Sequence, residues 1–204
     1  MTILEEWSIT PEQLTDLLGE NPSLRGMLFG YVAELKLKER IAAFPEVSSI
    51  TKFDDHDRKK KGDFYILYKN RAFSLELKSL QTASIKYEEE NSRWSGKAQV
   101  DASDKRTITL PDGSEMDTTL LLRGEFDILA VNCYAFNNEW NFVFARNQDL
   151  PCSTYSRYTQ IQRENLIASL ITVTWPPKPP FDLDIRYLLD KMIAEGGGSN
   201  PIDI

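Results

Sequence analysis

The chain has 204 residues, 41% of them hydrophobic and 27% charged, and its formal net charge at pH 7 is -7. Such a composition supplies one sizeable core, and the acidic balance argues against a general nucleic-acid coat protein, which would be basic overall. One histidine and two cysteines argue against zinc proteases, multi-histidine nucleases and four-thiolate zinc sites. The phosphate-binding patterns GxxxxGK[ST] and GxGxxG are absent. Chemistry in this chain therefore has to use carboxylates, lysine and a divalent metal.

The sequence favours a single cytoplasmic domain. Apolar runs stay well below the roughly 18 to 20 residues of a membrane span, and the acidic start MTILEEWSITPEQ differs from a signal peptide. We therefore expect no membrane contact. One domain is expected over residues 1–195, with a core of about 22–175, and residues 196–204 are expected to form a flexible tail.

The first part of the chain is predicted to be helical. Thr10-Pro11 is typical of a helix N-cap followed by proline at the first helical position, which predicts a helix over about 11–19. A second helix is predicted from Leu24 to about Phe44, before Pro45. Its apolar positions recur at helical spacing: Leu28, Tyr31, Val32, Leu35 and Ile41.

A polar loop over 51–62 follows these helices. Beyond it, the spacing of apolar residues changes from the helical period to the alternation of strands. The loop contains the run DDHDRKKKG, which could be a solvated loop or, through His56 with its aspartates and the basic run after it, a metal or phosphate contact. The following runs FYILYK and AFSLELKSL alternate as strands do and are separated by Asn70-Arg71. They predict a β-hairpin.

The rest of the chain predicts a mixed sheet and two more helices. Residues 82–93 suggest a loop or an exposed helix, and the turn sequence PDGS at 111–114 predicts a second hairpin. The apolar run FDILAVNCY predicts a strand buried on both faces. Further strands are predicted at NFVFA and ITVTW, and further helices at 159–170 and 185–194. The fold class is therefore α/β (α+β), with a mixed central sheet flanked by helices and an added β-hairpin.

The first hairpin gathers the residues that could carry chemistry. Alternation in AFSLELK places Glu76 and Lys78 on the polar face. A two-residue loop at Asn70-Arg71 pairs Asp63 with Lys78, so both carboxylates share that face, about 7 to 8 Å apart, and could converge on one metal ion. A four-residue loop keeps this parity, whereas a three-residue loop would turn Asp63 to the core. The alternative is a solvated face with a salt bridge worth under about 1 kcal/mol.

Gly62-Asp63, twelve intervening residues and then Glu76-Leu77-Lys78 resemble the PD-(D/E)xK nuclease superfamily, the fold of most type II restriction endonucleases. The resemblance covers roughly residues 24–80, and Gly62 stands where the family usually has proline. It implies a restriction-endonuclease-like core in which Asp63, Glu76 and Lys78 are catalytic.

The same resemblance implies a metal site. Mg²⁺, which Mn²⁺ could replace, would be held by Asp63, Glu76 and the backbone carbonyl of Leu77. Glu34, in the preceding helix, would be a further ligand, or it lies simply at a helix flank. Lys78 would act on the attacking water as general base, or stabilise the transition state as an ammonium group.

The polar segment from Ser92 to Arg123 is long for a connection and is the main candidate for DNA recognition. Arginine, lysine and glutamine read base edges and phosphates, and a two-stranded ribbon fits the major groove. The same hairpin could instead be a dimer arm. The candidate contact residues in this segment, together with one near the later helix, are Lys97, Gln99, Lys105, Arg106, Arg123 and Arg157.

The expected function is a Mg²⁺-dependent endodeoxyribonuclease that hydrolyses phosphodiester bonds of double-stranded DNA, as a type II restriction endonuclease does. A homodimer is expected because two-fold-related sites cut both strands of a palindrome. A cognate DNA methyltransferase would then belong to the same restriction-modification system. The alternatives are a repair, junction-resolving or transposon-linked nuclease of the same fold, and a catalytically silent DNA-binding module.

Overall fold

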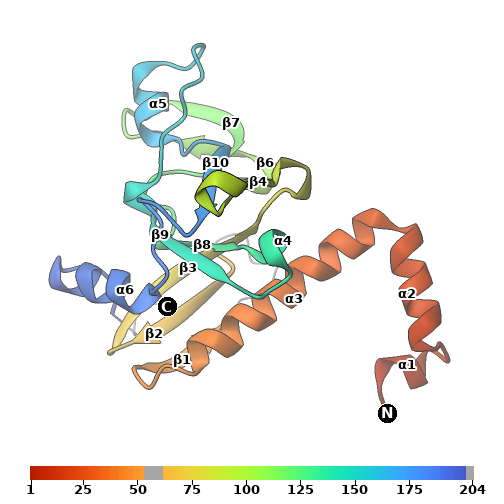
Figure 1. Ribbon diagram of the computed structural model, residues 1–204. Helices are drawn as coiled ribbons and strands as arrows, with labels where there is room; N and C mark the ends of the chain where they lie inside the picture. Colours follow the sequence, from red (N-terminus) through yellow and green to blue (C-terminus); the bar gives the residue numbers. More distant parts are fainter. Residues whose placement is uncertain (53–61, 201–204) are drawn as a thin grey trace.

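The computed structural model describes residues 1–52 and 62–200 of the chain (Figure 1). The hypotheses about His56 and about the basic run at 58–61 concern residues outside these ranges. The architecture is mixed α+β, as predicted, with a mixed central sheet flanked by helices. Within the described residues, no helix is both long and apolar enough to cross a membrane.

The central sheet has five strands in the order β1-β2-β3-β8-β9. The pairing of β3 with β8 is parallel and the other pairings are antiparallel. Every residue of β8 is buried, because its apolar run is covered on both faces of the sheet. The bounds are β1 Val47–Thr51, β2 Phe64–Tyr68, β3 Arg71–Ser79, β8 Ile128–Asn132 and β9 Phe142–Arg146.

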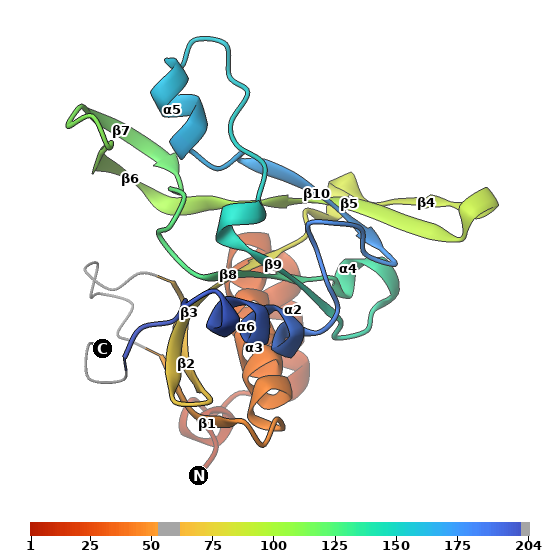
Figure 2. The same ribbon diagram turned by 90° about the vertical axis from the view of Figure 1, so that its left-hand side faces the viewer.

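Helices cover one face of this sheet (Figure 2). The long helix α3 (Pro22–Ala42) contributes Leu37 and Ile41, and α6 (Ile185–Ala194) contributes Leu188 and Leu189 to one buried cluster with β2 and β3. The remaining helices are α1 Ile3–Glu6, α2 Pro11–Glu20, α4 Tyr134–Asn137 and α5 Gln160–Asn165, with 3₁₀ turns at Thr82–Ser84, Glu89–Asn91 and Asn147–Asp149.

A second, three-stranded sheet covers the opposite face of β8 and β9. Its order is β10-β5-β4, and small side chains such as Ala98 allow close contact with Val131 and Val143 of the central sheet. A separate hairpin of β6 and β7 packs on Leu166 just after α5. The bounds are β4 Lys86–Glu88, β5 Arg93–Gln99, β6 Asp101–Thr109, β7 Glu115–Leu120 and β10 Leu170–Trp175.

Most predicted elements are present, but several differ, and the short helices α1 and α4 were not predicted. The segment 82–93, expected as a loop or exposed helix, holds β4 between two 3₁₀ turns, and β5 follows it. The helix predicted over 159–170 ends at Asn165, because Leu166 and Ile167 are buried and extended. β1 was not predicted, since its sequence VSSIT is short and half polar.

The segment 196–200, expected as the start of a flexible tail, is instead anchored to β3. Ser199 and Ala72 exchange two backbone hydrogen bonds of 2.9 and 3.0 Å. The guanidinium of Arg71 donates to the carbonyl oxygens of Gly196 and Gly197. These contacts supply partners for β3 where β8 has not yet begun. Residues 201–204 of the expected tail lie outside the described residues.

Candidate active site

The β2–β3 hairpin sets the register of the site. Its two-residue turn is Lys69-Asn70, with φ of 47° and 59°, so the prediction of Asn70-Arg71 is wrong by one residue. Positive φ at both turn residues matches the twist of the flanking strands, and asparagine tolerates it well. The pair farthest from the turn is Phe64 with Leu75, which brings Asp63 opposite Glu76 instead of Lys78. The predicted parity is kept, because the pairing changes by two residues.

Backbone contacts fix Asp63 against β3. Its N–H donates to the carbonyl oxygen of Leu75 at 2.7 Å, and its Oδ2 accepts from the N–H of Leu77 at 2.6 Å. Gly62 makes this approach possible, since its φ is +84° and a Cβ there would lie 2.7 Å from the same Leu75 oxygen. Proline, with φ near -65°, could not adopt this conformation.

Glu76 and Lys78 form a partly buried ion pair. Lys78 Nζ lies 2.7 Å from Glu76 Oε1, and the side chains are 21% and 12% exposed. Burial acts to lower the pKa of Lys78, but the negative charges of Glu76, Asp63 and Asp101 outweigh it and raise that pKa above its ordinary value. Lys78 is therefore an ammonium group at neutral pH.

The pKa shift of Asp63 disfavours its charged form, whereas that of Lys78 favours the charged form. Burial and the neighbouring charge of Glu76 raise the pKa of Asp63 from 3.8 to about 6. The hydrogen bond from Leu77 and the positive charges of Lys78 and Lys52 oppose that rise. Two carboxylates held this close in a partly buried place are stabilised by any cation that binds between them.

Lys52, at the end of β1, is a site residue that the sequence did not reveal. Its Nζ lies 2.6 Å from Glu34 Oε2 and 4.6 Å from the centre of the Tyr31 ring. Its charge also lowers the pKa of Asp63. Glu34 of α3 is thus brought to the site through Lys52. A lysine at the start of a polar loop carries no motif, so only the fold could identify it.

Asp101, the first residue of β6, is a second missed residue. Its Oδ2 accepts from Gln99 Nε2 at 3.1 Å and from Ser169 Oγ at 2.9 Å, whereas its Oδ1 is buried and has no hydrogen-bond partner in the described part of the structure. Its charge contributes to the raised pKa of Lys78. Asp101 therefore lies close enough to the Glu76–Lys78 pair for its charge to act on Lys78.

The protein ligands available to a metal ion are few. Among residues 1–52 and 62–200, no group of three or more His, Cys, Asp or Glu side chains gathers as a metal cluster. The N–H of Leu77 points to Asp63, and the carbonyl of a strand residue points to the same edge as its N–H. Two carboxylates and the Leu77 carbonyl are therefore the donor set that this edge can offer.

Five of the six DNA-contact candidates are exposed, including Arg123, and Arg106 is half-buried. Lys97 and Gln99 are exposed on β5, Lys105 is exposed on β6, and Arg157 is exposed before α5. Lys105 Nζ lies 3.6 Å from Asp117 Oδ2, across the β6–β7 hairpin. These side chains can reach an external ligand.

The other two candidates are engaged within the protein. The guanidinium of Arg106 pairs with the nearly buried carboxylate of Glu125. Arg123 donates to the carbonyl oxygens of Gln148 and Leu150, at 2.7 and 3.1 Å, and to Cys152 Sγ at 2.9 Å. Both contact sets hold loops in place, which favours a structural role for these arginines.

Comparisons with models of protein families, with curated proteins and with solved structures each found no match. The chemistry has to be judged from geometry. Asp63, Glu76 and Lys78 gather at one end of the β2–β3 hairpin, and Lys52 connects Glu34 to them. This arrangement can bind a hard cation and place an ammonium group beside it.

Proposed function

We propose that this protein is a Mg²⁺-dependent endodeoxyribonuclease with a restriction-endonuclease-like core, and that it cuts double-stranded DNA at specific sites. The observation that carries the proposal is the convergence of Asp63, Glu76 and Lys78 at the end of one hairpin, on one face of the strand. The parallel pairing of β3 with β8 supports it as well. A solvated salt bridge would require neither a carboxylate whose pKa is raised, as that of Asp63 is, nor a glycine such as Gly62 that lets this carboxylate approach β3.

The residues present fit a magnesium ion. Mg²⁺ prefers oxygen ligands and keeps several waters, so two carboxylates and one backbone carbonyl suffice. Asp63, Glu76 and the Leu77 carbonyl would hold it, and Mn²⁺ would fit the same donors. When bound, the metal polarises a phosphate oxygen and lowers the pKa of a coordinated water. The raised pKa of Asp63 supports the assignment, since a cation relieves the repulsion from Glu76.

Lys78 would act as a charged stabiliser rather than as a general base. Its pKa is raised, so at neutral pH it has no free electron pair with which to accept a proton. The ammonium group would instead orient the attacking water by hydrogen bonding and neutralise charge that develops on the phosphate. The negative charge of Asp101, which acts on Lys78, would help to hold this ammonium group beside the phosphate.

Lys52 makes a second metal at Glu34 unnecessary. Its ammonium group already neutralises that carboxylate at 2.6 Å. The proposed site therefore takes one metal, and Glu34 serves to place Lys52, whose charge lies close enough to Asp63 to lower its pKa. A lysine in this place can also contact a phosphate oxygen of the bound strand.

The proposal is tested by digesting unmethylated phage DNA with Mg²⁺, beside metal-free and Ca²⁺ reactions. Lys78→Ala tests the site, and Lys191→Ala, which removes an exposed lysine of α6, is the matched control. Discrete bands with Mg²⁺ that disappear only with Lys78→Ala are the expected result. A smear that depends on Lys78 would keep the chemistry and remove site specificity, which would favour a repair or junction-resolving nuclease.

Absence of cleavage on linear and branched DNAs would contradict the proposal. DNA binding that is unchanged when Asp63→Asn and Glu76→Gln are combined would then identify a silent binding module. Restriction also implies that methylation of the recognition site by a partner methyltransferase blocks cleavage. That dependence is measured by comparing cleavage of the same DNA before and after site-specific methylation.

A further inference from the structure

The first two helices, α1 and α2, form an arm that extends away from the sheets (Figure 1). Capping boxes at Thr2 and Thr10 define both helix starts. Neither helix contains a buried residue, although the structure describes all of both. Helices of four and ten residues are marginal alone in water, so an arm of this kind is stabilised by packing on something else.

The arm and the adjoining part of α3 expose a run of large apolar side chains. Most of the exposed large hydrophobic residues in the described structure fall within the first 35 residues. Trp7 is 61% exposed and Met27 62% exposed, values that a monomer tolerates singly but seldom in a contiguous set. The set comprises Ile3, Trp7, Leu17, Leu24, Met27, Leu28, Tyr31 and Leu35.

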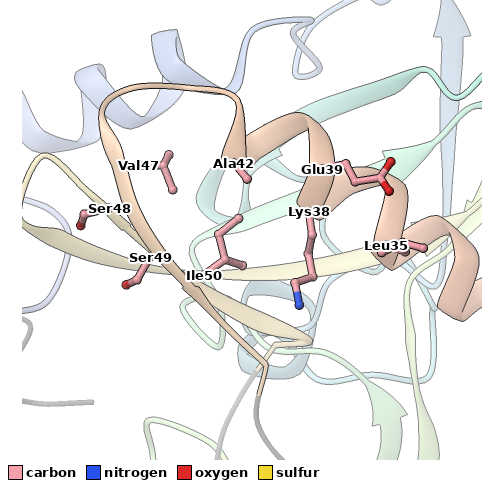
Figure 3. A pocket seen from close by; sticks show the side chains of 8 residues that line it. All are labelled: Leu35, Lys38, Glu39, Ala42, Val47, Ser48, Ser49 and Ile50. Atoms are coloured by element: carbon pink, nitrogen blue, oxygen red, sulfur yellow. The ribbon is translucent and has the colours of Figure 1, made fainter.

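A pocket of about 440 Å³ lies beyond this run, between the second half of α3 and the edge strand β1 (Figure 3). Its apolar lining comes from Leu35, Ala42, Val47 and Ile50. Lys38 and Glu39 line it as well (Figure 3). Glu39 is paired with Lys36 at 2.8 Å, so Lys38, beside Ile50, supplies the charge that is left for an occupant. The pocket therefore fits an apolar side chain that is accompanied by carboxylates.

The arm has that chemistry. Residues 1–24 contain no lysine or arginine and carry five acidic residues, and Glu5 and Glu6 directly precede Trp7. Such a segment repels DNA phosphates and anionic lipids, which removes both as its occupants. In the second half of α3, Glu34 is paired with Lys52 and Glu39 with Lys36, so Lys38 and Arg40 supply the remaining charge. One chain thus presents an acidic, aromatic arm and a basic, apolar pocket.

The arm of a chain does not reach the pocket of the same chain. α3 rises about 1.5 Å per residue, so Leu35 lies ~20 Å along the helix from Pro22, where the arm joins. α2 then leads away from α3, and α1 lies on the opposite side of the molecule from β1. A partner must therefore supply the arm that fills each pocket.

We propose that the arm docks on a second copy of this chain. In this two-fold exchange, Ile3 and Trp7 of each copy enter the α3–β1 pocket of the other, and Glu5 and Glu6 meet Lys38 and Arg40. The arm and the pocket of both copies are then occupied, so the contact closes as a dimer and does not propagate into fibres. The proposal rests on the arm and the pocket and is independent of the proposed nuclease chemistry.

Sedimentation of the full chain between about 0.1 and 50 µM tests the exchange. The wild-type chain is expected to dimerise, and Trp7→Glu is expected to raise the dimer dissociation constant at least about tenfold, as the loss of a buried aromatic anchor does. Tyr155→Glu is the matched control, because Tyr155 is 49% exposed in the segment before α5, which lies away from α1, α3 and β1 (Figure 1). Far-ultraviolet circular dichroism of each variant checks that it is folded.

A charge exchange locates the contact. Glu6→Lys and Lys38→Glu are each expected to weaken the dimer, and equal amounts of the two single variants are expected to form a heterodimer in which both exchanged contacts pair opposite charges. The double variant, which restores the pairing in both contacts, is expected to recover most of the wild-type affinity. A wild-type chain that stays monomeric at 50 µM, or a dimer that Trp7→Glu and Lys38→Glu leave unchanged, overturns the proposal. Neither result bears on cleavage by the separate site at Asp63.

Discussion

The Oδ2 of Asp63 accepts a hydrogen bond from the backbone N–H of Leu77 at 2.6 Å. Asp63 directly precedes β2, and Leu77 lies between Glu76 and Lys78 on β3. The contact therefore fixes the position of Asp63 relative to both of these side chains. It also leaves Asp63 Oδ1 as the oxygen available to a cation. The candidate site is therefore positioned by the hairpin itself, and changes that displace Gly62 or Leu77 should disturb all three residues.

Replacement of Gly62 by alanine should abolish the site without abolishing the fold. Left-handed backbone strain and the contact with the Leu75 carbonyl together should cost about 2 to 4 kcal/mol and displace Asp63. Gly124→Ala is the matched control, since Gly124 also has positive φ but nothing within 4 Å of its Cβ position. The Gly124→Ala variant should lose only about 1 to 2 kcal/mol of its free energy of unfolding. Urea unfolding and DNA cleavage, measured on both variants, separate the two effects; equal losses would contradict this account.

Metal binding should release a proton near pH 6. The pKa of Asp63 is raised to about 6 in the fold, so a part of the metal-free protein is protonated there and Mg²⁺ has to displace that proton. Apparent Mg²⁺ affinity should therefore rise with pH through about 6 and level off above it. Calorimetry in two buffers of different ionisation enthalpy measures the released proton, and a buffer-independent heat at pH 6 would count against the assignment.

The same raised pKa makes a stability prediction for the metal-free protein. Between about pH 4 and pH 6 the native Asp63 holds a proton that the unfolded chain has lost, so its contribution to stability falls as pH rises. Asp63→Asn removes that titration. The melting temperature of the variant relative to wild type, measured in EDTA, should therefore increase from pH 4 to pH 6.5 and stay constant above; a difference that is independent of pH would refute it.

Removal of the Lys52 charge should shift metal binding to higher pH. Lys52 lowers the pKa of Asp63, so Lys52→Met should raise that pKa further and leave Glu34 without its ion-pair partner at 2.6 Å. The pH at which Mg²⁺ binding is half-maximal should move upward. Lys36→Met is the control, because Lys36 pairs with Glu39 on the exposed side of α3. Titration of both variants with Mg²⁺ across pH 5 to 8 decides, and coincident curves would exclude a role for Lys52.

The basic candidates for DNA contact should divide into two groups. Arg106→Gln should destabilise the protein by about 3 kcal/mol, because it removes the guanidinium charge that neutralises the nearly buried Glu125 carboxylate. Lys97→Ala and Arg157→Ala should leave stability unchanged and should each reduce by about one the slope of the logarithm of DNA affinity against the logarithm of salt concentration. Urea unfolding and salt-dependent DNA binding distinguish the groups, and a salt slope unchanged by all three substitutions would remove this surface from recognition.

Local patterns in the sequence predicted the hairpin and the shared face of Asp63, Glu76 and Lys78. Alternation specifies a face with period two, so it tolerated the one-residue error in the turn. Helix α6 was predicted at its observed ends, because both its amphipathic period and its termini are encoded locally. The same spacing did not identify the buried face of α3, where Leu35, one of the apolar positions at helical spacing, is 53% exposed and Ala33 and Leu37 are buried.

The remaining site residues depend on contacts between distant segments. Lys52 and Asp101 approach Asp63 and Lys78 only after β1 and β6 have taken their places, and no short pattern marks either residue. Arg106 and Arg123 appeared to be DNA contacts because sequence alone does not show whether a guanidinium is already engaged. Their carboxylate and carbonyl partners lie 19 to 27 residues away in the chain.

The pairing of Ser199 with Ala72 has a consequence for biosynthesis. β2 and β3 can form their hairpin as soon as they leave the ribosome, but the open flank of β3 at Ala72 receives its partner only when residue 199 has been translated. At about 5 to 20 residues per second, the 126 residues between Ala72 and Ser199 delay that step by on the order of ten seconds. A nascent chain thus exposes an unpaired edge on the strand that also carries Glu76 and Lys78, and a chaperone that shields extended segments would find its binding site there.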